Sequence, residues 1–334
     1  MNEEIKENKM GVMPMNRLII NMSVPMMISM LVQALYNVVD SIFVAMIDEK
    51  ALTAVSMAFP IQGLIIAVAA GTGVGVNAIL SRALGAKNNE KADKTAENGI
   101  FLAVASYVVF LLIGIFAVKP FYMSQTDDME IVNYGVKYLT IVCVLSLGVF
   151  IQIMFERLLQ STGKTVYTMI SQALGAVINI IMDPIMIFGI GFFPKMGVTG
   201  AAAATVIGQI AAAAVGFMFN KTKNKEIHIN MIGFRPDTGM IKEIYEIGVP
   251  SMVMQAIGSV MVYGMNRILI TFNSTGVAVF GVYFKLQSFV FMPVFGLNNG
   301  MIPILAYNLG AHKRERFMQG VKLSVIYAVI IMTA

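Results

Sequence analysis

Long apolar runs separated by short polar segments make up most of this chain. Runs of about 20 apolar residues, the length that a helix needs to cross about 30 Å of hydrocarbon, recur from end to end. They fall at about 17–46, 52–80, 97–118, 134–158, 166–192, 198–219, 246–272, 277–306 and 320–334. The pattern predicts an all-α polytopic membrane protein.

Composition agrees with this prediction. Hydrophobic residues make up 57% of the chain and charged residues 13%, against about 25% charged residues in a soluble domain. The net charge of +5 comes from basic residues in short segments between apolar runs, which is the pattern that membrane orientation produces. We therefore expect a lipid bilayer, and no nucleic acid, as partner. Because no metal-ligand, nucleophile–base or nucleotide pattern occurs, we expect neither an enzyme nor a cofactor or metal.

Basic residues are concentrated in the segments that lie on the same side of the predicted spans as the N-terminus. These are Lys6, Lys9, Arg17, Arg82, Lys87, Lys91, Lys94, Arg157, Lys164, Lys221, Lys223, Lys225, Arg235, Lys242, Lys313, Arg314 and Arg316. The opposite side carries Lys50, Lys119 and Lys195 among several acids. The positive-inside rule then places the N-terminus in the cytoplasm, and we expect a multi-pass protein of the bacterial inner membrane.

An internal repeat relates the beginning of the chain to its last third. Shifting by 225 positions matches Val24-Pro25 with Val249-Pro250, Phe59 with Phe284, Gln62 with Gln287, Gly71 and Gly75 with Gly296 and Gly300, and Leu84-Gly85-Ala86 with Leu309-Gly310-Ala311. Six predicted spans separate equivalent positions, so both copies enter the membrane from the same side as a parallel repeat. We expect two pseudo-symmetric lobes of six helices.

The repeat suggests the division into domains. We predict a cytoplasmic tail at 1–16, an N-lobe at 17–219, a cytoplasmic linker at 220–243 and a partial C-lobe at 244–334. A complete second lobe would need three more helices. We therefore expect the chain to be a fragment or a truncated product with an incomplete second lobe.

Glycines cluster within the second apolar run at Gly71, Gly73 and Gly75. They superficially resemble a phosphate-binding loop, but no strand precedes them and they lie deep in an apolar segment. Close helix packing is the interpretation that we favour.

Two acids interrupt apolar runs that otherwise indicate spanning helices. A carboxylate in hydrocarbon costs several kcal/mol unless it is paired, hydrated or protonated, so Asp40 and Asp183 mark a candidate ion or substrate path. At 1.5 Å rise per residue, both lie roughly 10 Å from the outer surface. Residues that share their helix faces or their depth are Gln33, Tyr36, Asn37, Tyr138, Gln172, Asn179, Thr205 and Gln209.

This polar layer predicts a cation- or proton-binding site in the N-lobe. Burial and a second carboxyl group both favour the protonated form of an acid, so a proton can bind and leave near ambient pH. In the alternative interpretation, Asp40 and Asp183 are separate clamps between helices. In the C-lobe, Arg267 either snorkels to the interface or lines the cavity, and Lys285 either pairs with an acid or repels bound cations.

Four stretches carry a resemblance to a known family. They are the run from Pro25 to Asp40, the run from Arg82 to Asn88, the run from Phe155 to Lys164 in the expected loop after the fourth span, and Asn179-Ile180-Ile181-Met182-Asp183-Pro184. In this order they make the chain similar to the multidrug and toxic compound extrusion (MATE) family of antiporters.

The resemblance implies twelve helices in two lobes that alternate between outward-open and inward-open shapes. It also implies export of cationic, amphipathic drugs in exchange for H⁺ or Na⁺. The cation site of the family would correspond here to Asp40, Asp183, Asn179, Tyr36, Tyr138 and Thr205. The substrate cavity is then expected to include Gln33, Asn37, Gln172, Gln209, Lys285 and Arg267.

Two other functions compete with this hypothesis. A flippase for lipid-linked saccharides or peptidoglycan precursor would need several arginines for an anionic pyrophosphate, and only Arg267 and Lys285 favour it. A membrane enzyme or scaffold would need a catalytic or metal cluster that the sequence lacks. We therefore expect a monomeric antiporter that binds small organic cations.

Overall fold

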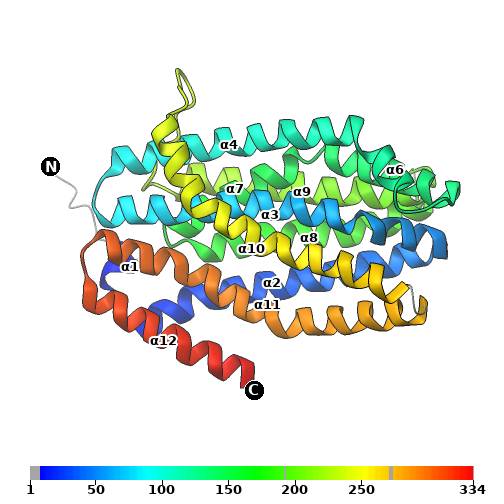
Figure 1. Ribbon diagram of the computed structural model, residues 1–334. Helices are drawn as coiled ribbons and strands as arrows, with labels where there is room; N and C mark the ends of the chain where they lie inside the picture. Colours follow the sequence, from blue (N-terminus) through cyan, green and yellow to red (C-terminus); the bar gives the residue numbers. More distant parts are fainter. Residues whose placement is uncertain (1–7, 192, 271–273, 334) are drawn as a thin grey trace.

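The computed structural model describes residues 8–191, 193–270 and 274–333, without some side chains between positions 259 and 290. Within these ranges every regular element is a helix (Figure 1). The helices are α1 (Lys9–Val12), α2 (Met15–Ala45), α3 (Glu49–Gly85), α4 (Asn89–Phe116), α5 (Val118–Met123), α6 (Met129–Val144), α7 (Leu147–Ser161), α8 (Thr165–Phe188), α9 (Val198–Lys223), α10 (Thr238–Ile270), α11 (Ser274–Gly310) and α12 (Arg314–Thr333).

The long helices have the length and apolarity of membrane spans. Six of them in the described part qualify singly, namely α2, α3, α4, α8, α9 and α12, and the pair α6 and α7 qualifies together. The predicted runs at 246–272 and 277–306 coincide with α10 and α11, which are 33 and 37 residues long. The predicted class, an all-α polytopic membrane protein, is confirmed.

The fourth predicted span is bent rather than straight. Its two halves, α6 and α7, meet at 45°, where Ser146 Oγ donates a hydrogen bond of 2.7 Å to the Cys143 carbonyl. The prediction of a loop from Phe155 was wrong, because α7 continues to Ser161 and buries Arg157 to 8% exposure. The apolar pattern ends before the helix does, since the last turns of α7 carry polar side chains that pack inside the protein.

Short polar residues start several helices and set their boundaries. The side chains of Asp48, Asn88 and Asp128 accept hydrogen bonds from backbone N–H groups in the first turns of α3, α4 and α6, which satisfies donors that the helix itself leaves free. Lys50 Nζ also lies 3.0 Å from Asp128. The hydrogen bond that Lys50 Nζ donates to the Asp128 carboxylate lowers the pKa of the Asp128 carboxyl group.

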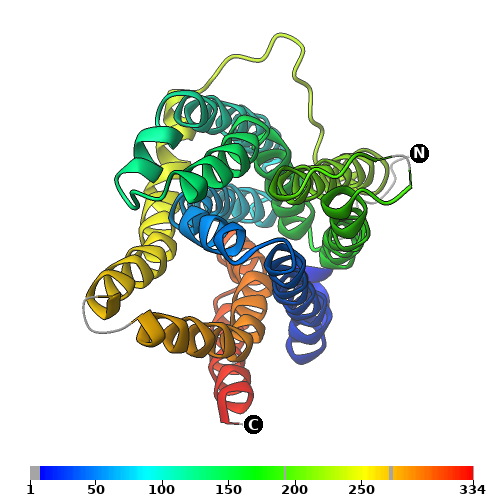
Figure 2. The same cartoon turned by 90° about the vertical axis from the view of Figure 1, so that its right-hand side faces the viewer.

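The basic segments gather at one end of the bundle, here called the N-terminal end. Asn8 donates to the Thr162 carbonyl at 3.1 Å, and Asn308 donates to the Met10 carbonyl at 3.1 Å. The segment between α9 and α10 arches along one side (Figure 2). Its backbone N–H at His228 donates to Asp93 of α4 at 2.7 Å. The predicted grouping of these segments on one side of the spans thus matches the structure.

Two equivalent pairs of helices contribute to the interface between the N-lobe and the C-lobe, and α3 also packs against α11. Helix α3 packs against α10, and α2 packs against α11, so the pairs correspond under the 225-residue shift. Both α2 and α10 run away from the N-terminal end (Figure 1), as a parallel repeat requires.

The contacts between the lobes are reciprocal at individual residues. A Cβ on Gly71 would lie 2.8 Å from the Met252 nitrogen, and one on the equivalent Gly296 would lie 2.7 Å from the Met27 nitrogen. Likewise Gly85 abuts the Tyr307 carbonyl and Gly310 abuts the Arg82 carbonyl. Contacts that recur with the partners exchanged are those of a two-fold relation. The glycines of α3 therefore serve close packing, as predicted.

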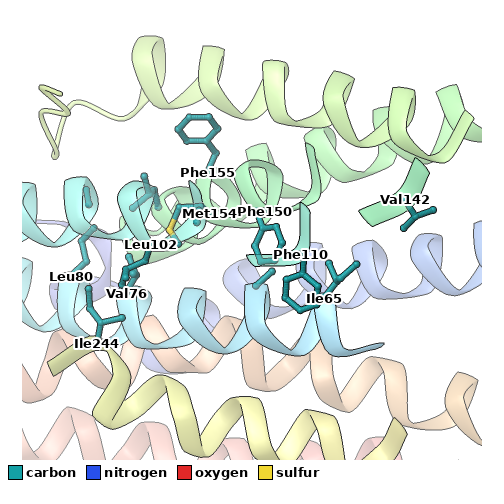
Figure 3. Packing of buried hydrophobic residues seen from close by; sticks show 14 of the residues in the cluster. Ile65, Val76, Leu80, Leu102, Phe110, Val142, Phe150, Met154, Phe155 and Ile244 are labelled. Atoms are coloured by element: carbon teal, nitrogen blue, oxygen red, sulfur yellow. The ribbon is translucent and has the colours of Figure 1, made fainter. Parts of the chain in front are cut away.

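Apolar side chains fill the space between α3, α4 and α7. The rings of Phe110 and Phe150 lie 5.6 Å apart between their centroids, and Val76, Met154 and Ile244 continue the cluster toward the N-terminal end (Figure 3). The free Cys143 belongs to the same buried core. This packing holds α7 rigidly, and with it the polar residues of its last turns.

The reciprocal glycine contacts generate a test of the lobe interface. Gly310→Ala puts a methyl group into the backbone of Arg82, so we expect a loss of about 1–3 kcal/mol and a lower thermal unfolding midpoint of the detergent-purified protein. Gly258→Ala is the matched control, because a Cβ at Gly258 meets nothing within 4 Å. Equal midpoints for the two variants would contradict the close approach.

Candidate functional site

The packing of α2 against α8 brings the two membrane-embedded acids together. Asp183 is fully buried and Asp40 is half-buried, and their carboxyl groups are close enough to interact electrostatically. Two neighbouring carboxyl groups resist carrying two negative charges at once. Asp40 Oδ1 and Asp183 Oδ2 are buried and accept no hydrogen bond from the protein.

Neither acid has a cationic partner among the described residues, since the ion pairs there involve other groups. Two carboxyl groups without a counter-ion in an apolar bundle favour a bound proton or a bound cation. The arrangement differs from that of separate clamps, in which each acid would be satisfied by its own amide or hydroxyl.

An amide and a hydroxyl extend the site onto α9. Asn179 Nδ2 lies 3.4 Å from Asp183 Oδ1 and 3.4 Å from Thr205 Oγ1. Helix α9 approaches this closely because two glycines face each other, and a Cβ on Gly208 would lie 2.7 Å from the Gly175 carbonyl oxygen. Small residues let the helices meet, as is usual inside membranes.

Two tyrosines lie near the acids. Tyr36 interacts electrostatically with Asp40 and Asp183, and Tyr138 interacts with Asp40 and Tyr36. Tyr138 is 3% exposed, and its hydroxyl accepts a hydrogen bond of 3.0 Å from Gln62 Nε2. Gln62 was not among the predicted site residues, although the repeat had singled it out.

The other predicted cavity residues differ in exposure. Gln33 and Gln209 are half-buried and Asn37 is exposed. The helical positions of Arg267 and Lys285 fall in α10 and α11, but their side chains lie outside the described part of the structure.

Gln172 has a different partner from the one expected. It donates through Nε2 to Glu156 Oε2 at 2.7 Å, far along α8 from Asp183. Sequence reasoning missed Glu156 as a buried acid because it assigned this stretch to a loop. The spacing of Gln152, Glu156 and Gln160 along one helical face is the signal that could have revealed it.

The described residues of the site offer oxygen atoms and no fixed positive charge. Carboxylate, amide and hydroxyl oxygens are ligands for protons and for hard monovalent cations. Among the described residues, no group of three His, Cys, Asp or Glu side chains is arranged to hold a metal ion. Reversible binding of a proton or a monovalent cation is the chemistry that this arrangement supports best.

Comparison with known proteins gives consistent matches over most of the chain. The family model MatE matches residues 25–185 and 250–334. The multidrug export protein MepA of Staphylococcus haemolyticus is 29% identical over 318 residues, which cover 92% of this chain and 68% of that protein. MepA of Staphylococcus aureus is 26% identical and is covered to 66%. The chain thus spans about two thirds of the length of these relatives.

Solved structures show the same arrangement of helices. The outward-facing structure of a multidrug resistance MATE family transporter of the MOP superfamily is similar with a TM-score of 0.90 and 27% sequence identity. The match covers 99% of this chain and 73% of that one.

The geometry around Asn179 predicts its contribution to stability. Asn179→Leu removes the donor to both Asp183 and Thr205, and we expect a loss of about 1 kcal/mol, the usual value of such a bond in a membrane. Asn37→Leu is the matched control, because the Asn37 side chain is exposed. Thermal unfolding of both purified variants measures the difference, and an Asn179→Leu midpoint as high as that of the control would argue against the bonded cluster.

Proposed function

This chain belongs to the MatE family, and we propose that it exports amphipathic organic cations in exchange for H⁺ or Na⁺. The observation that carries the proposal is the pair of neighbouring carboxyl groups on α2 and α8, which interact electrostatically and have no counter-ion among the described residues. The MepA relatives are named multidrug export proteins, which supports multidrug efflux as the activity.

The exchange follows from competition for one negative site. A proton or sodium ion on the carboxyl pair neutralises the charge that would attract a cationic drug, and the drug in turn disfavours the ion. By linkage, each ligand lowers the affinity for the other to the same extent. Alternation between outward-open and inward-open shapes then couples drug exit to ion entry.

Orientation and location complete the proposal. The basic segments at the N-terminal end support a cytoplasmic location of that end by the positive-inside rule. With this orientation, Asp40 and Asp183 lie in the outer half of the bacterial inner membrane. The transporter acts as a monomer and needs no cofactor. A flippase function has weaker support, because Arg267 and Lys285 are the residues that favour it and their side chains are not described.

Removing the charge of one acid tests the coupling. Asp40→Asn keeps the size and hydrogen-bonding capacity of the side chain but removes the exchangeable proton. We expect the variant to reach the membrane at normal levels and to lose gradient-driven ethidium efflux from vesicles. Asp127→Asn, an exposed acid in the loop before α6, is the matched control. Full efflux in Asp40→Asn would remove Asp40 from the mechanism.

The choice of ion can be read from drug binding. If the coupling ion is H⁺, ethidium binding to the purified protein weakens as the pH falls, because protons displace the cation from the carboxyl pair, and the dependence flattens in Asp40→Asn. If the ion is Na⁺, added sodium weakens binding at constant pH instead. Fluorescence polarisation of ethidium measures both. Binding that responds to neither ion would contradict competition at this site.

A further inference from the structure

A second buried acid lies in the half of the N-lobe nearer the N-terminal end. Glu156 of α7 is 3% exposed. Its Oε1 accepts a hydrogen bond of 2.9 Å from Gln152 Nε2, and its Oε2 accepts one of 2.7 Å from Gln172 Nε2. Both partners are neutral amides, so the carboxylate is hydrogen-bonded but its charge is not compensated by them.

The neighbouring arginine directs its side chain elsewhere. Arg157 Nη1 donates to Gln160 Oε1 at 2.9 Å and to Asn299 Oδ1 of α11 at 3.0 Å. Its chain passes over Gly73, where a Cβ would lie 2.6 Å from Arg157 Cγ. Arg157 therefore acts on Glu156 only through space, while its hydrogen bonds join α7 to the C-lobe.

No other charged side chain that the structure describes forms an ion pair with Glu156. The helices packed against α7 are α3, α4, α8, α9 and α11. Their charged residues are Glu49, Lys50, Arg82, Glu90, Lys91, Asp93, Lys94, Glu97, Asp183, Lys221 and Lys223, together with Lys285, whose side chain is not described. An ionisable group inside a membrane bundle without an ion-pair partner is more often functional than structural.

The surroundings of Glu156 suit the protonated form as well as the ionised one. Gln172 Oε1 is buried and has no hydrogen-bond partner. Rotation of this amide by half a turn would present Oε1 to a protonated Glu156 Oε2, which would then donate the hydrogen bond. The site thus holds a ready acceptor for the acid proton.

We propose that Glu156, with Gln152 and Gln172, forms a second proton-binding site of the N-lobe. At 1.5 Å per residue, Glu156 lies about 8 Å from the C-terminal end of α7, which is at the N-terminal end of the bundle. Asp183 lies near the C-terminal end of α8, toward the other end of the bundle. Gly175 and Gly208 of α8 and α9 pack closely between the two places. Binding a proton from water and returning it to water changes no other bond.

The role of this site in transport rests on the proposed function, but its protonation does not. In a proton-coupled exporter, a carboxyl group near the N-terminal end can bind the entering proton after it leaves Asp40 and Asp183. A merely structural Glu156 would keep one ionisation state throughout the working pH range.

Infrared difference spectroscopy of the purified protein between low and high pH tests protonation directly. We expect a carboxylic acid C=O band that is lost in Glu156→Gln and kept in Glu315→Gln, an exposed acid on α12. If Glu156→Gln fails to fold, Glu156→Asp keeps the carboxyl group in altered surroundings, so the band should shift in frequency. A folded Glu156→Gln with an unchanged difference spectrum, or an unshifted band in Glu156→Asp, would overturn the proposal.

The same spectra separate this proposal from the proposed function. Loss of a different band in Asp40→Asn or Asp183→Asn reports on Asp40 and Asp183 alone. Either proposal can therefore be contradicted without affecting the other. Reconstituted Glu156→Gln should still exchange drug for drug, but pH-driven efflux should fall at least about tenfold. Unchanged pH-driven efflux together with a lost band would overturn the transport role and leave the protonation site.

Discussion

The packing of α2 between α8 and α11 is the interaction on which the rest of this structure depends. Toward α8 it places Asp40 close enough to Asp183 for the two carboxyl groups to interact electrostatically. Toward the other lobe, Gly296 of α11 meets the backbone of Met27. One helix therefore contributes to both the candidate ion site and the lobe interface. A change in its tilt would displace residues at both.

Helix α8 connects two acidic places of different character. Near one end, Asp183 shares its surroundings with a second carboxyl group, and Asn179 joins it to α9. Near the other end, Gln172 bonds Glu156, whose neighbour Arg157 reaches α11 at 3.0 Å. In both places the low polarity of the bundle makes an uncompensated charge costly, so protons or cations have reason to bind. The two places are separated along α8, since Gln172 lies near its beginning and Asp183 near its end.

The limits of sequence reasoning are visible at particular residues. The bend between α6 and α7 was missed because the apolar run continues through it, and the break depends on a hydrogen bond between Ser146 and Cys143. Glu156 was assigned to a loop because charged residues usually mark the end of a span. It is buried between α7 and α8, where Gln152 and Gln172 donate hydrogen bonds to its carboxylate, and such surroundings come from more than one helix.

By itself, the sequence determined the helical class, the approximate spans, the parallel repeat and the suspicion that Asp40 and Asp183 belong together. These follow from local rules, because apolar length, helical spacing and a constant offset are properties of one segment or of two compared segments. Only the tertiary structure decided which side chains meet, such as Gln62 with Tyr138, Gln172 with Glu156 and Arg157 with Asn299. Those partners depend on the rotation and separation of neighbouring helices, which no single segment encodes. Glycines such as Gly73 and Gly208 permit the close approach because a Cβ there would clash.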